Sequence, residues 1–566
     1  MKNPVRLLVG GLLFICVGVG CGNGTSHNRD HGPVAPSLIF STYLGGSKPC
    51  DSCGDALTFV LNSATDSDGN VYVTGATQVS DLPVRNAMQP QPLAGSMRSA
   101  FVTKYDPTGQ ILWCTYLGGD QENIGIGVAA MPGGGVAVSG LTSADNAGPF
   151  PTKNPFQAGN NGLSDYFVAV FDKDGNLQYA TYLGGSGIEG EANAVFADDS
   201  SNGNNIAVDS QGLVYLTGIT GSGGSESIPF PGTSNAVQPE FGGMIDAFLA
   251  IIDPSKAGPA SLVYASFIGG AQNEKGHGIT VNSSGSRITV VGYTQSTDFP
   301  TTPNGFRSTP APAGFTSNGF VAEFASSSPG NSSSTYTAAY VTYLGANSSE
   351  ARDDCYAVTL DPHGLIVVTG RTESADFPML GSSSPSIYNS APYLKPRVSN
   401  DEPYLVKLNS SLSGADSLVY ATFLGGGSTT SGGGGAFCSA VAVDASGVSY
   451  VVGETSAQGT LYAYSSEPAV APQATPFTSD ALFPANQGCF DALHMQVSPD
   501  GSTLSYSTFL GAADNDRGYG LAVDPSGNVI ISGLTYSTNF PLKNPAQAWP
   551  GNQGKMNGFV TKLSAQ

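Results

Sequence analysis

Charged residues, tryptophan and helical periodicity are all scarce in this chain of 566 residues, and each scarcity removes a class of protein. Asp, Glu, Lys and Arg make up 11% of the residues, and no stretch sustains the apolar period of an amphipathic helix. Two tryptophans accompany 24 tyrosines and 27 phenylalanines. A helical architecture is therefore excluded, whereas 75 glycines and 37 prolines favour short strands joined by many turns.

Basic residues are the scarcest charged type, since 22 Lys and Arg stand against 43 Asp and Glu and the net charge is −21. Nucleic acids and anionic membrane surfaces recruit basic patches, so this balance argues against both as partners. The acidic surface is compatible with cations or neutral glycans but selects neither, because net charge also serves solubility alone.

Motifs for nucleophiles, zinc and dinucleotides are also missing. The chain has no G-x-S-x-G and no H-E-x-x-H, and its G-x-G-x-x-G match at 185–190 is not followed by a helix pattern. Asp-rich turns such as residues 66–70 begin like calcium loops but lack the later Glu, so turn formation explains them. We expect no cofactor, and Ca²⁺ is the one cofactor left open.

The first 20 residues have the features of an export signal: a basic start, then an apolar stretch from Leu7 to Gly20 that is short for a membrane span. Cys21 follows in a pattern that resembles a bacterial lipobox, although Gly18 departs from it. We expect lipidation of Cys21, with plain secretion as the alternative. Residues 21–36 have the composition of a flexible tether, so the expected location is the outer membrane or cell surface.

Six cysteines lie beyond Cys21, at Cys50, Cys53, Cys114, Cys355, Cys438 and Cys489. An exported chain meets an oxidising compartment, so pairing is allowed. Cys50 and Cys53 form a C-x-x-C, for which a local loop disulfide is expected rather than a zinc site. We expect Cys438 to pair with Cys489 or with Cys355, and Cys114 to stay a buried free thiol.

A five-residue motif organises the rest of the chain. It begins as Thr42-Tyr43-Leu44-Gly45-Gly46 and returns with a mean period of about 78 residues. The seven copies have leucine or isoleucine at the third position, at Leu44, Leu117, Leu183, Ile268, Leu344, Leu424 and Leu510. A period this long, with strand composition, predicts repeated small sheets rather than a helical solenoid.

Each repeat holds four predicted strands, A to D, and the motif closes strand D. In the last unit, residues 520–524, 529–533 and 559–563 are predicted strands A, B and C. Strand B always ends in Gly-x-Thr, and a Phe-Pro pair follows in six of the seven long loops, with Leu82-Pro83 in the other. We interpret both features as structural: a tight exit from strand B and an apolar plug under the loop.

The succession Y-x-T-Y-L-G-G, G-I-A-V-D-x-x-G-N-V-Y-V-T-G-x-T, D-F-P and A-F-V-x-K-L resembles the bacterial seven-bladed β-propeller repeat family over residues 37–566. The resemblance implies an exported all-β protein, a seven-bladed β-propeller of four-stranded antiparallel blades, with no shared catalytic residues. Seven D strands exist only if residues 38–44 are counted, so this N-terminal strand should complete the last blade beside 559–563. The expected domains are a signal peptide (1–20), a tether (21–36) and the propeller.

The long D-to-A and B-to-C loops should emerge on one face, which we call the long-loop face, and binding is expected there. Carboxylates near the starts of the A strands could rim the channel mouth and hold a cation, or supply an acid–base pair for glycan cleavage. The alternative is that each carboxylate caps its own turn. The candidate ligand-binding residues are Glu122, Glu189, Glu191, Glu274, Arg352, Asp353, Asp516 and Arg517.

The expected function is a monomeric, surface-tethered binding or scaffold module that takes a protein or polysaccharide on the long-loop face. No catalytic residue is expected, because the chemically capable residues are scattered over different blades. The alternatives are a glycan-active lyase or hydrolase that uses the carboxylates at the channel mouth, and a structural envelope component. Four aromatic residues of the long loops are candidates to stack on a sugar: Phe315, Tyr462, Tyr464 and Trp549.

Overall fold

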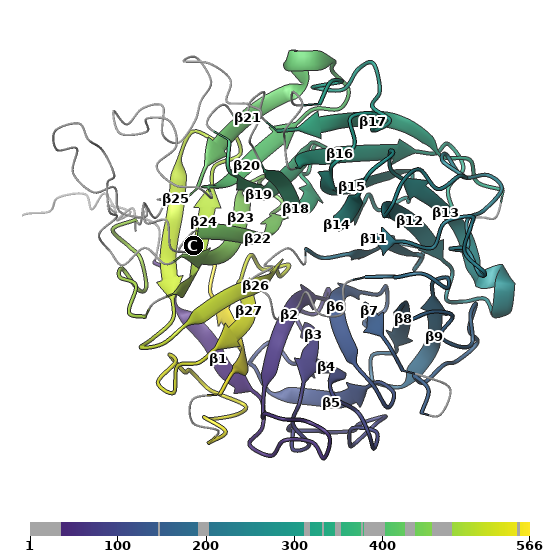
Figure 1. Ribbon diagram of the computed structural model, residues 1–566. Helices are drawn as coiled ribbons and strands as arrows, with labels where there is room; N and C mark the ends of the chain where they lie inside the picture. Colours follow the sequence, from purple (N-terminus) through teal and green to yellow (C-terminus); the bar gives the residue numbers. More distant parts are fainter. Residues whose placement is uncertain are drawn as a thin grey trace, which may run out of the picture. The chain divides into compact units, whose positions relative to one another are not determined.

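The computed structural model describes residues 35–144, 148–190, 203–310, 317–330, 333–345, 352–374, 377, 402–424, 436–455, 478–488, 490–551 and 555–565. Residues 35–566 form one compact unit, in which seven four-stranded antiparallel sheets follow one another around a ring (Figure 1). The prediction of a seven-bladed β-propeller is confirmed.

Each blade contributes one strand to each of four concentric positions. The innermost strands are β2 (Thr58–Thr65), β6 (Asn123–Ala130), β10 (Ile206–Val208), β14 (Glu274–Val281), β18 (Asp353–Leu360), β22 (Ala436–Val443) and β26 (Asp516–Val523). The second strands are β3 (Val71–Thr77), β7 (Val136–Thr142), β11 (Val214–Thr220), β15 (Arg287–Thr294), β19 (Ile366–Thr372), β23 (Ser449–Thr455) and β27 (Val529–Thr535). The third strands are β4 (Ser99–Tyr105), β8 (Asp165–Phe171), β12 (Asp246–Ile252), β16 (Asn318–Ala325), β20 (Glu402–Leu408), β24 (Asp491–Val497) and β28 (Asn557–Leu563). The outer strands are β5 (Ile111–Leu117), β9 (Leu177–Leu183), β13 (Leu262–Ile268), β17 (Thr337–Leu344), β21 (Leu418–Phe423), β25 (Leu504–Leu510) and β1 (Leu38–Leu44).

The ring closes through its two chain ends, as the strand count predicts. β1 pairs antiparallel with β28, with Tyr43 opposite Phe559. The buried hydroxyls of Ser41 and Thr561 lie 2.8 Å apart, across 520 residues of sequence. One four-stranded sheet therefore contains both ends of the fold, and no blade is left with three strands.

Phe-Pro pairs plug the base of the long loops, as predicted. The Phe150 ring packs on Phe167 of β8 with ring centroids 4.4 Å apart, and the Phe150 N–H donates to the Tyr182 hydroxyl at 2.8 Å. The same ring pairing recurs in blade seven, where the centroids of Phe540 and Phe559 lie 4.6 Å apart. The motif tyrosine thus fastens the loop backbone while the phenylalanine fills the space between loop and sheet.

The B-to-C loops run back along the outer strands and cover their open edges. In blade one, Arg85 and Cys114 exchange both backbone hydrogen bonds, and Lys153 pairs with Ala180 in the same way in blade two. The outer edge of a sheet is a template for unwanted pairing, and these loops occupy it. Part of the backbone of these B-to-C loops is therefore paired with the outer strands and is not available to bind a ligand.

These loops carry a second motif, N-x-x-Q, that repeats around the ring. Its asparagine takes a left-handed backbone in three loops, with φ of 47° at Asn86, 52° at Asn154 and 43° at Asn544. Its glutamine side-chain oxygen accepts the N–H of the first motif glycine in four blades: Gln89 with Gly118, Gln157 with Gly184, Gln238 with Gly269 and Gln547 with Gly45. Each glutamine therefore ties a B-to-C loop to the end of the outer strand.

The Asp-rich turns are turns, as interpreted from the sequence. Asp66 Oδ1 accepts the backbone N–H groups of Asp68 and Asn70, each at 3.0 Å. Asp361 and Asp524 make the same two bonds in blades five and seven. Oδ1 of each turn carboxylate therefore binds the backbone of its own turn, while Oδ2 lies close to a lysine of the blade: Lys104, Lys407 or Lys562.

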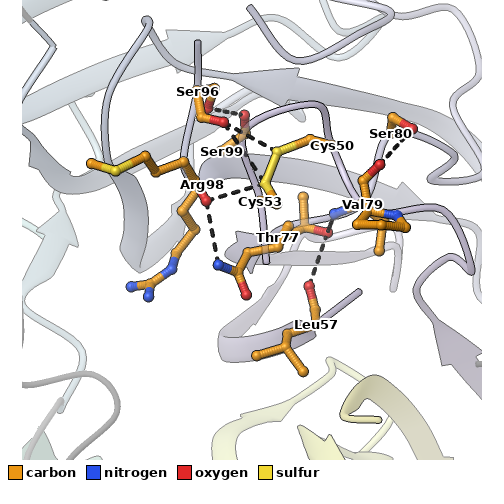
Figure 2. Close-up of a disulfide and its surroundings, with 12 residues drawn as sticks. Cys50, Cys53, Leu57, Thr77, Val79, Ser80, Ser96, Arg98 and Ser99 are labelled. Carbon is orange, nitrogen blue, oxygen red and sulfur yellow. Dashed lines mark hydrogen bonds between the residues drawn. A yellow bond between two sulfur atoms is a disulfide. The ribbon is translucent and has the colours of Figure 1, made fainter. Parts of the chain in front are cut away.

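Cys50 and Cys53 form the expected disulfide, with Cα atoms 5.0 Å apart (Figure 2). Both sulfur atoms lie over the Ser96 backbone carbonyl, at 3.1 Å for Cys50 and 3.7 Å for Cys53. The bridge thus closes a four-residue loop that rests on the segment preceding β4.

We expect replacement of both cysteines by serine to lower the free energy of unfolding by about 2 kcal/mol, because the loop it closes is very short. Chemical denaturation of the double variant against the parent protein measures this difference. A loss above about 4 kcal/mol would mean that the bridge also stabilises the native contacts of the loop.

The expected pairing of Cys438 is wrong, because its thiol is free and buried. Cys355 is also free, and its Sγ lies 3.1 Å from the Tyr404 hydroxyl on the side of its blade that faces blade four. Cys438 points toward Thr369 of blade five. Equivalent side chains on neighbouring blades point in the same direction around the ring. The sheet of blade five therefore lies between the Cys355 and Cys438 thiols. Cys489 lies outside the described residues, and Cys114 is the expected buried free thiol.

Candidate functional site

The predicted carboxylates sit at the starts of inner strands but are buried between blades. Glu274, Asp353 and Asp516 are the first residues of β14, β18 and β26, and at most 1% of each residue is exposed. Glu189 is equally buried and pairs by a β-bridge with Thr220, at the end of β11. The structure therefore places these four carboxylates beneath the long-loop face rather than on an open rim.

The threonine of Gly-x-Thr is the first partner of each carboxylate. Thr294 donates its hydroxyl to Glu274 Oε1 at 2.6 Å, and the Gly270 N–H donates to Glu274 Oε2 at 2.8 Å. In blade seven, Ser537 and the Ala512 N–H donate to Asp516 Oδ2 at 2.9 and 2.7 Å. Each carboxylate thus links the end of strand B and the neighbouring loop to the inner strand. This is the capping role that the sequence predicted as the alternative to a ligand-binding rim.

A second polar residue, contributed by the preceding blade, faces each carboxylate, and we call the two residues a junction pair. The second residue begins a third strand, as Asp246 begins β12. Both members meet at the first glycine of the organising motif. A Cβ on Gly269 would lie 2.5 Å from Asp246 Oδ1 and 2.8 Å from Glu274 Oε2. Asn318–Asp353 and Asp491–Asp516 meet in the same way at Gly345 and Gly511. Asp165–Glu189 is the fourth junction pair with a carboxylate opposite the Gly-x-Thr threonine, since the Glu189 charge acts on Asp165 and Glu189 bridges to Thr220 ahead of β10.

Burial and mutual repulsion disturb the ionisation of the acid pairs. Burial and, to a lesser extent, the neighbouring Glu274 charge raise the pKa of Asp246 to about 7. The pKa values of Asp165 and Asp491 rise to about 7 for the same two causes, with Glu189 and Asp516 as the neighbours. These raised values fit carboxyls that are confined together with little solvent.

The space between the two side chains of a junction pair has room only for glycine. We therefore expect Gly269→Ala to lower the free energy of unfolding by about 3 kcal/mol. The added methyl group would overlap two buried carboxyl groups that are themselves held by hydrogen bonds. Gly54→Ala is the matched control, since nothing lies within 4 Å of its Cβ position. Urea unfolding of both variants measures the difference, and equal stabilities would show that the junction yields to the extra atom.

The two predicted arginines belong to a different group at the channel mouth, which we call the mouth cluster. Arg352 Nε lies 2.9 Å from Asp354 Oδ2, and Arg371 Nε lies 3.3 Å from the same oxygen. Arg517 Nε lies 3.2 Å from Glu454 Oε2. Arg352 and Arg517 thus pair with Asp354 and Glu454. The adjacent strand residues Asp353 and Asp516 point to the opposite face of the sheet.

Aromatic rings connect the mouth cluster over blades five to seven. The Arg371 guanidinium lies 5.6 Å from the ring centroid of Phe437, which pairs with Glu454 in the ladder of β22 and β23. The Arg517 guanidinium lies 5.3 Å from the Phe490 ring. Arg352 is the most exposed cation of the cluster, with 38% of its side chain accessible. The cluster sits at the long-loop end of the inner strands, next to the channel.

Glu122, the remaining described candidate, pairs with Arg98 at 2.5 Å. Burial raises the Glu122 pKa and the Arg98 charge opposes that rise. Trp549 packs its ring against Tyr43 with centroids 5.2 Å apart, so it contributes to the core of blade seven. Glu191, Phe315, Tyr462, Tyr464 and the predicted lipidation residue Cys21 lie outside the described residues.

A cavity of about 340 Å³ occupies the channel toward the short-turn face and is lined by inner-strand residues of all seven blades. Its lining includes Asn62, Thr280, Val358, Val441 and Leu521, and no lining residue in the described chain is charged. The six full-length inner strands each carry a register shift just before these residues, next to buried side chains such as Leu61, Ile126 and Tyr356. The cavity therefore lies apart from both the junction pairs and the mouth cluster.

The described part of the chain contains neither a membrane-spanning helix nor a cluster of metal ligands. No helix there is long and apolar enough to cross a membrane. No group of three or more His, Cys, Asp or Glu residues there is arranged to hold a metal ion. Each junction pair supplies at most two carboxyl groups, fewer than the six to eight oxygen ligands that Ca²⁺ usually takes.

Comparison with known proteins agrees with the architecture. Residues 506–541 match the family model described as Beta-propeller repeat. The chain is 26% identical over 246 residues to the regulatory protein FlaEY of Caulobacter vibrioides, a match that covers 44% of this chain and 23% of that protein. The chain thus spans about a quarter of the length of that relative.

Solved structures that resemble the chain are propeller-containing proteins of low identity. A quinohemoprotein alcohol dehydrogenase of Pseudomonas putida is 9% identical with a TM-score of 0.32, covering 94% of this chain and 76% of its own. The β-propeller domain of the Trilobed protease of Pyrococcus furiosus is 7% identical with a TM-score of 0.36, covering 85% of this chain and 90% of its own. Neither likeness bears on activity. The seven-sheet ring and the match at residues 506–541 together show that this chain carries the Beta-propeller repeat and folds as a seven-bladed β-propeller.

Proposed function

We propose that this protein is a non-catalytic binding or scaffold module that takes a protein or polysaccharide ligand at the long-loop face. The mouth cluster is the observation that carries the proposal. Arg352, Arg371 and Arg517 place three guanidinium groups at the long-loop end of the inner strands, in contact with Phe437 and Phe490. Guanidinium groups beside aromatic rings are common in recognition surfaces, because they offer directional donors and a stacking face.

The junction pairs argue for binding rather than chemistry. General acid–base catalysis needs an acid and a base that reach a substrate, whereas Glu274, Asp353 and Asp516 are buried and hydrogen-bonded within the fold. The described residues therefore leave the mouth cluster as the better ligand surface. Acidic groups on the ligand would complement its arginines.

Export and lipid attachment remain part of the proposal, on the strength of the signal-like first 20 residues and Cys21. The described fold begins beside the short-turn face, where the Ser37 N–H donates to Ser564 Oγ at 2.9 Å and the Ala565 N–H donates to the Asn528 side chain. Metabolic labelling with a fatty acid, compared between the parent chain and Cys21→Ala, tests the attachment.

Binding of the purified chain to a glycan array and to envelope extracts tests the function. Arg352→Glu should weaken binding at least tenfold, and the fold should be retained because Arg371 still pairs with the buried Asp354. Lys173→Glu is the control, since Lys173 is exposed and lies on the short-turn face. Equal binding by both variants would remove the mouth cluster as the site. Turnover of a polysaccharide by the purified protein would support the glycan-active alternative instead.

A further inference from the structure

Three of the junction pairs consist of two acids, and the hydrogen bonds around them are unequal. Glu274 accepts a hydrogen bond on each oxygen, from Thr294 and from Gly270, as an ionised carboxylate does. Asp246 accepts the Gly242 N–H on Oδ2 at 2.7 Å, while its buried Oδ1 has no partner among the described residues. That Oδ1 is the oxygen that meets Glu274 Oε2 at Gly269.

The other two acid pairs repeat the unpartnered aspartate oxygen, although Glu189 Oε2 and Asp516 Oδ1 are also buried without a partner in the described chain. Asp165 Oδ2 accepts the Asn161 N–H and the Gln157 side-chain amide, and Asp491 Oδ2 accepts the Gln487 N–H. Oδ1 of each is buried and has no partner in the described chain. Asp491 Oδ1 meets Asp516 Oδ2 at Gly511, as Asp246 meets Glu274 at Gly269. A buried oxygen without a partner is costly unless it carries a proton that it can donate.

Other blades place an uncharged donor where these aspartates stand. The first residue of the third strand is Asn318 in blade four, Asn557 in blade seven and Ser99 in blade one. Asn318 faces Asp353 at Gly345, so an amide there occupies the place of a carboxyl group. Asparagine is close in shape to a protonated aspartate and can donate to the facing carboxylate. Blade five has Glu402 at this position, and the facing inner strand begins with Ala436 rather than an acid.

We propose that Asp165, Asp246 and Asp491 are protonated in the folded protein and each donates its Oδ1–H to the carboxylate of Glu189, Glu274 or Asp516. The ring then carries three proton-binding sites between blades. When the medium becomes alkaline, the O–H bond of each aspartic acid breaks, the proton passes to solvent, and two carboxylates are left facing each other. Repulsion within each pair then loosens three of the seven blade junctions.

The surroundings of the pairs favour the shared proton. The other charges that act on them are acidic: Glu226 on Glu189 and Asp514 on Asp516. Tyr343 faces Glu274, and Tyr43 faces Asp516. Burial raises the pKa of each phenol to about 12, so both tyrosines are neutral. Arg307 and Asp298 lie beside Tyr343. The remaining contacts are hydroxyl and N–H donors rather than the carbonyl oxygens that a cation would need.

The direction of the pH effect follows from proton binding. The raised aspartate pKa values, about 7 against 3.8, mean that the folded chain binds protons that the unfolded chain has released. This stability is fully present below the unfolded value and is lost as pH rises through the folded value. Near pH 6, the folded protein should hold about three more protons than the unfolded chain from these sites.

The full chain tests the proposal through the pH dependence of its urea midpoint between about pH 5 and 9. The triple variant D165N/D246N/D491N should lose about three protons of uptake on folding and keep its midpoint at high pH. Asn318→Asp should add one proton, because it creates a fourth acid pair with Asp353. Infrared spectra of the parent protein should show a protonated carboxylic acid band near neutral pH, so the proposal remains testable if a variant fails to fold.

The proposal would be overturned if the urea midpoint of the triple variant depended on pH as steeply as that of the parent protein, or if the carboxylic acid band were absent. Addition of CaCl₂ distinguishes a cation from a proton. If calcium ions restored the parent protein at high pH but left the triple variant unaffected, the pairs would be cation sites, and the proton assignment would be wrong.

Discussion

Deletion of residues 37–46 is expected to abolish cooperative folding. β1 supplies the entire outer ladder of blade seven and buries Phe40, Tyr43 and Leu44, so its loss exposes β28 and the core beneath. The expected loss is on the order of 5–15 kcal/mol, the whole stability of an ordinary domain. Circular dichroism during heating measures the transition.

A deletion of residues 22–31, within the predicted tether, is the matched control and should leave the transition in place. A separate peptide with the sequence of residues 37–46 should restore part of the lost stability, since it can pair with β28. A truncated protein that melts at the same temperature as the parent would contradict the closure of the ring through β1.

Replacement of Lys562 by methionine should cost about 3–5 kcal/mol, because it leaves a buried carboxylate without its partner. Lys562 Nζ lies 2.8 Å from Asp524 Oδ2, and each side chain is at most 3% exposed. Lys562 also donates to the Gly69 carbonyl of blade one at 3.2 Å, so the pair links the last blade to the first. Burial opposes ionisation of Asp524, but hydrogen bonds from Lys562 and Asn528 outweigh it and hold its pKa below the usual value.

The double variant D524N/K562M should recover most of this loss, because no uncompensated charge remains. Lys173→Met is the control at an exposed pair, where 64% of the lysine side chain is accessible, and it should leave the urea midpoint nearly unchanged. Urea denaturation at neutral pH compares the three proteins. Equal losses for Lys562→Met and Lys173→Met would show that burial adds nothing to the ion pair.

The repeat made most of the fold predictable. A recurring Tyr-Leu-Gly-Gly, a Gly-x-Thr and a Phe-Pro each mark one position in a blade, and the count of D strands requires residues 38–44 in the last one. The sequence also predicted two local features, the turn at Asp66 and the disulfide between Cys50 and Cys53. These features depend on residues close in sequence or on simple counting.

The candidate site was less predictable because it depends on register between blades. Spacing from the end of strand A identifies Glu274 and Asp516, but not that Asp246 and Asp491 of the preceding blades face them. The N-x-x-Q motif was present in the sequence as a signal of the loop-to-strand contacts. Its asparagine and glutamine are ordinary loop residues, so only their recurrence in several blades distinguishes them.

Closure through β1 also sets the order of events during synthesis. Ser41 leaves the ribosome 520 residues before Thr561, the residue whose side chain it meets. At roughly 5–20 residues per second, the first strand waits on the order of a minute for its partner. Blades one to six can be completed from consecutive strands during that time, while an unpaired strand remains open to wrong partners. The last step of folding is therefore the return of the oldest segment of the chain to the newest.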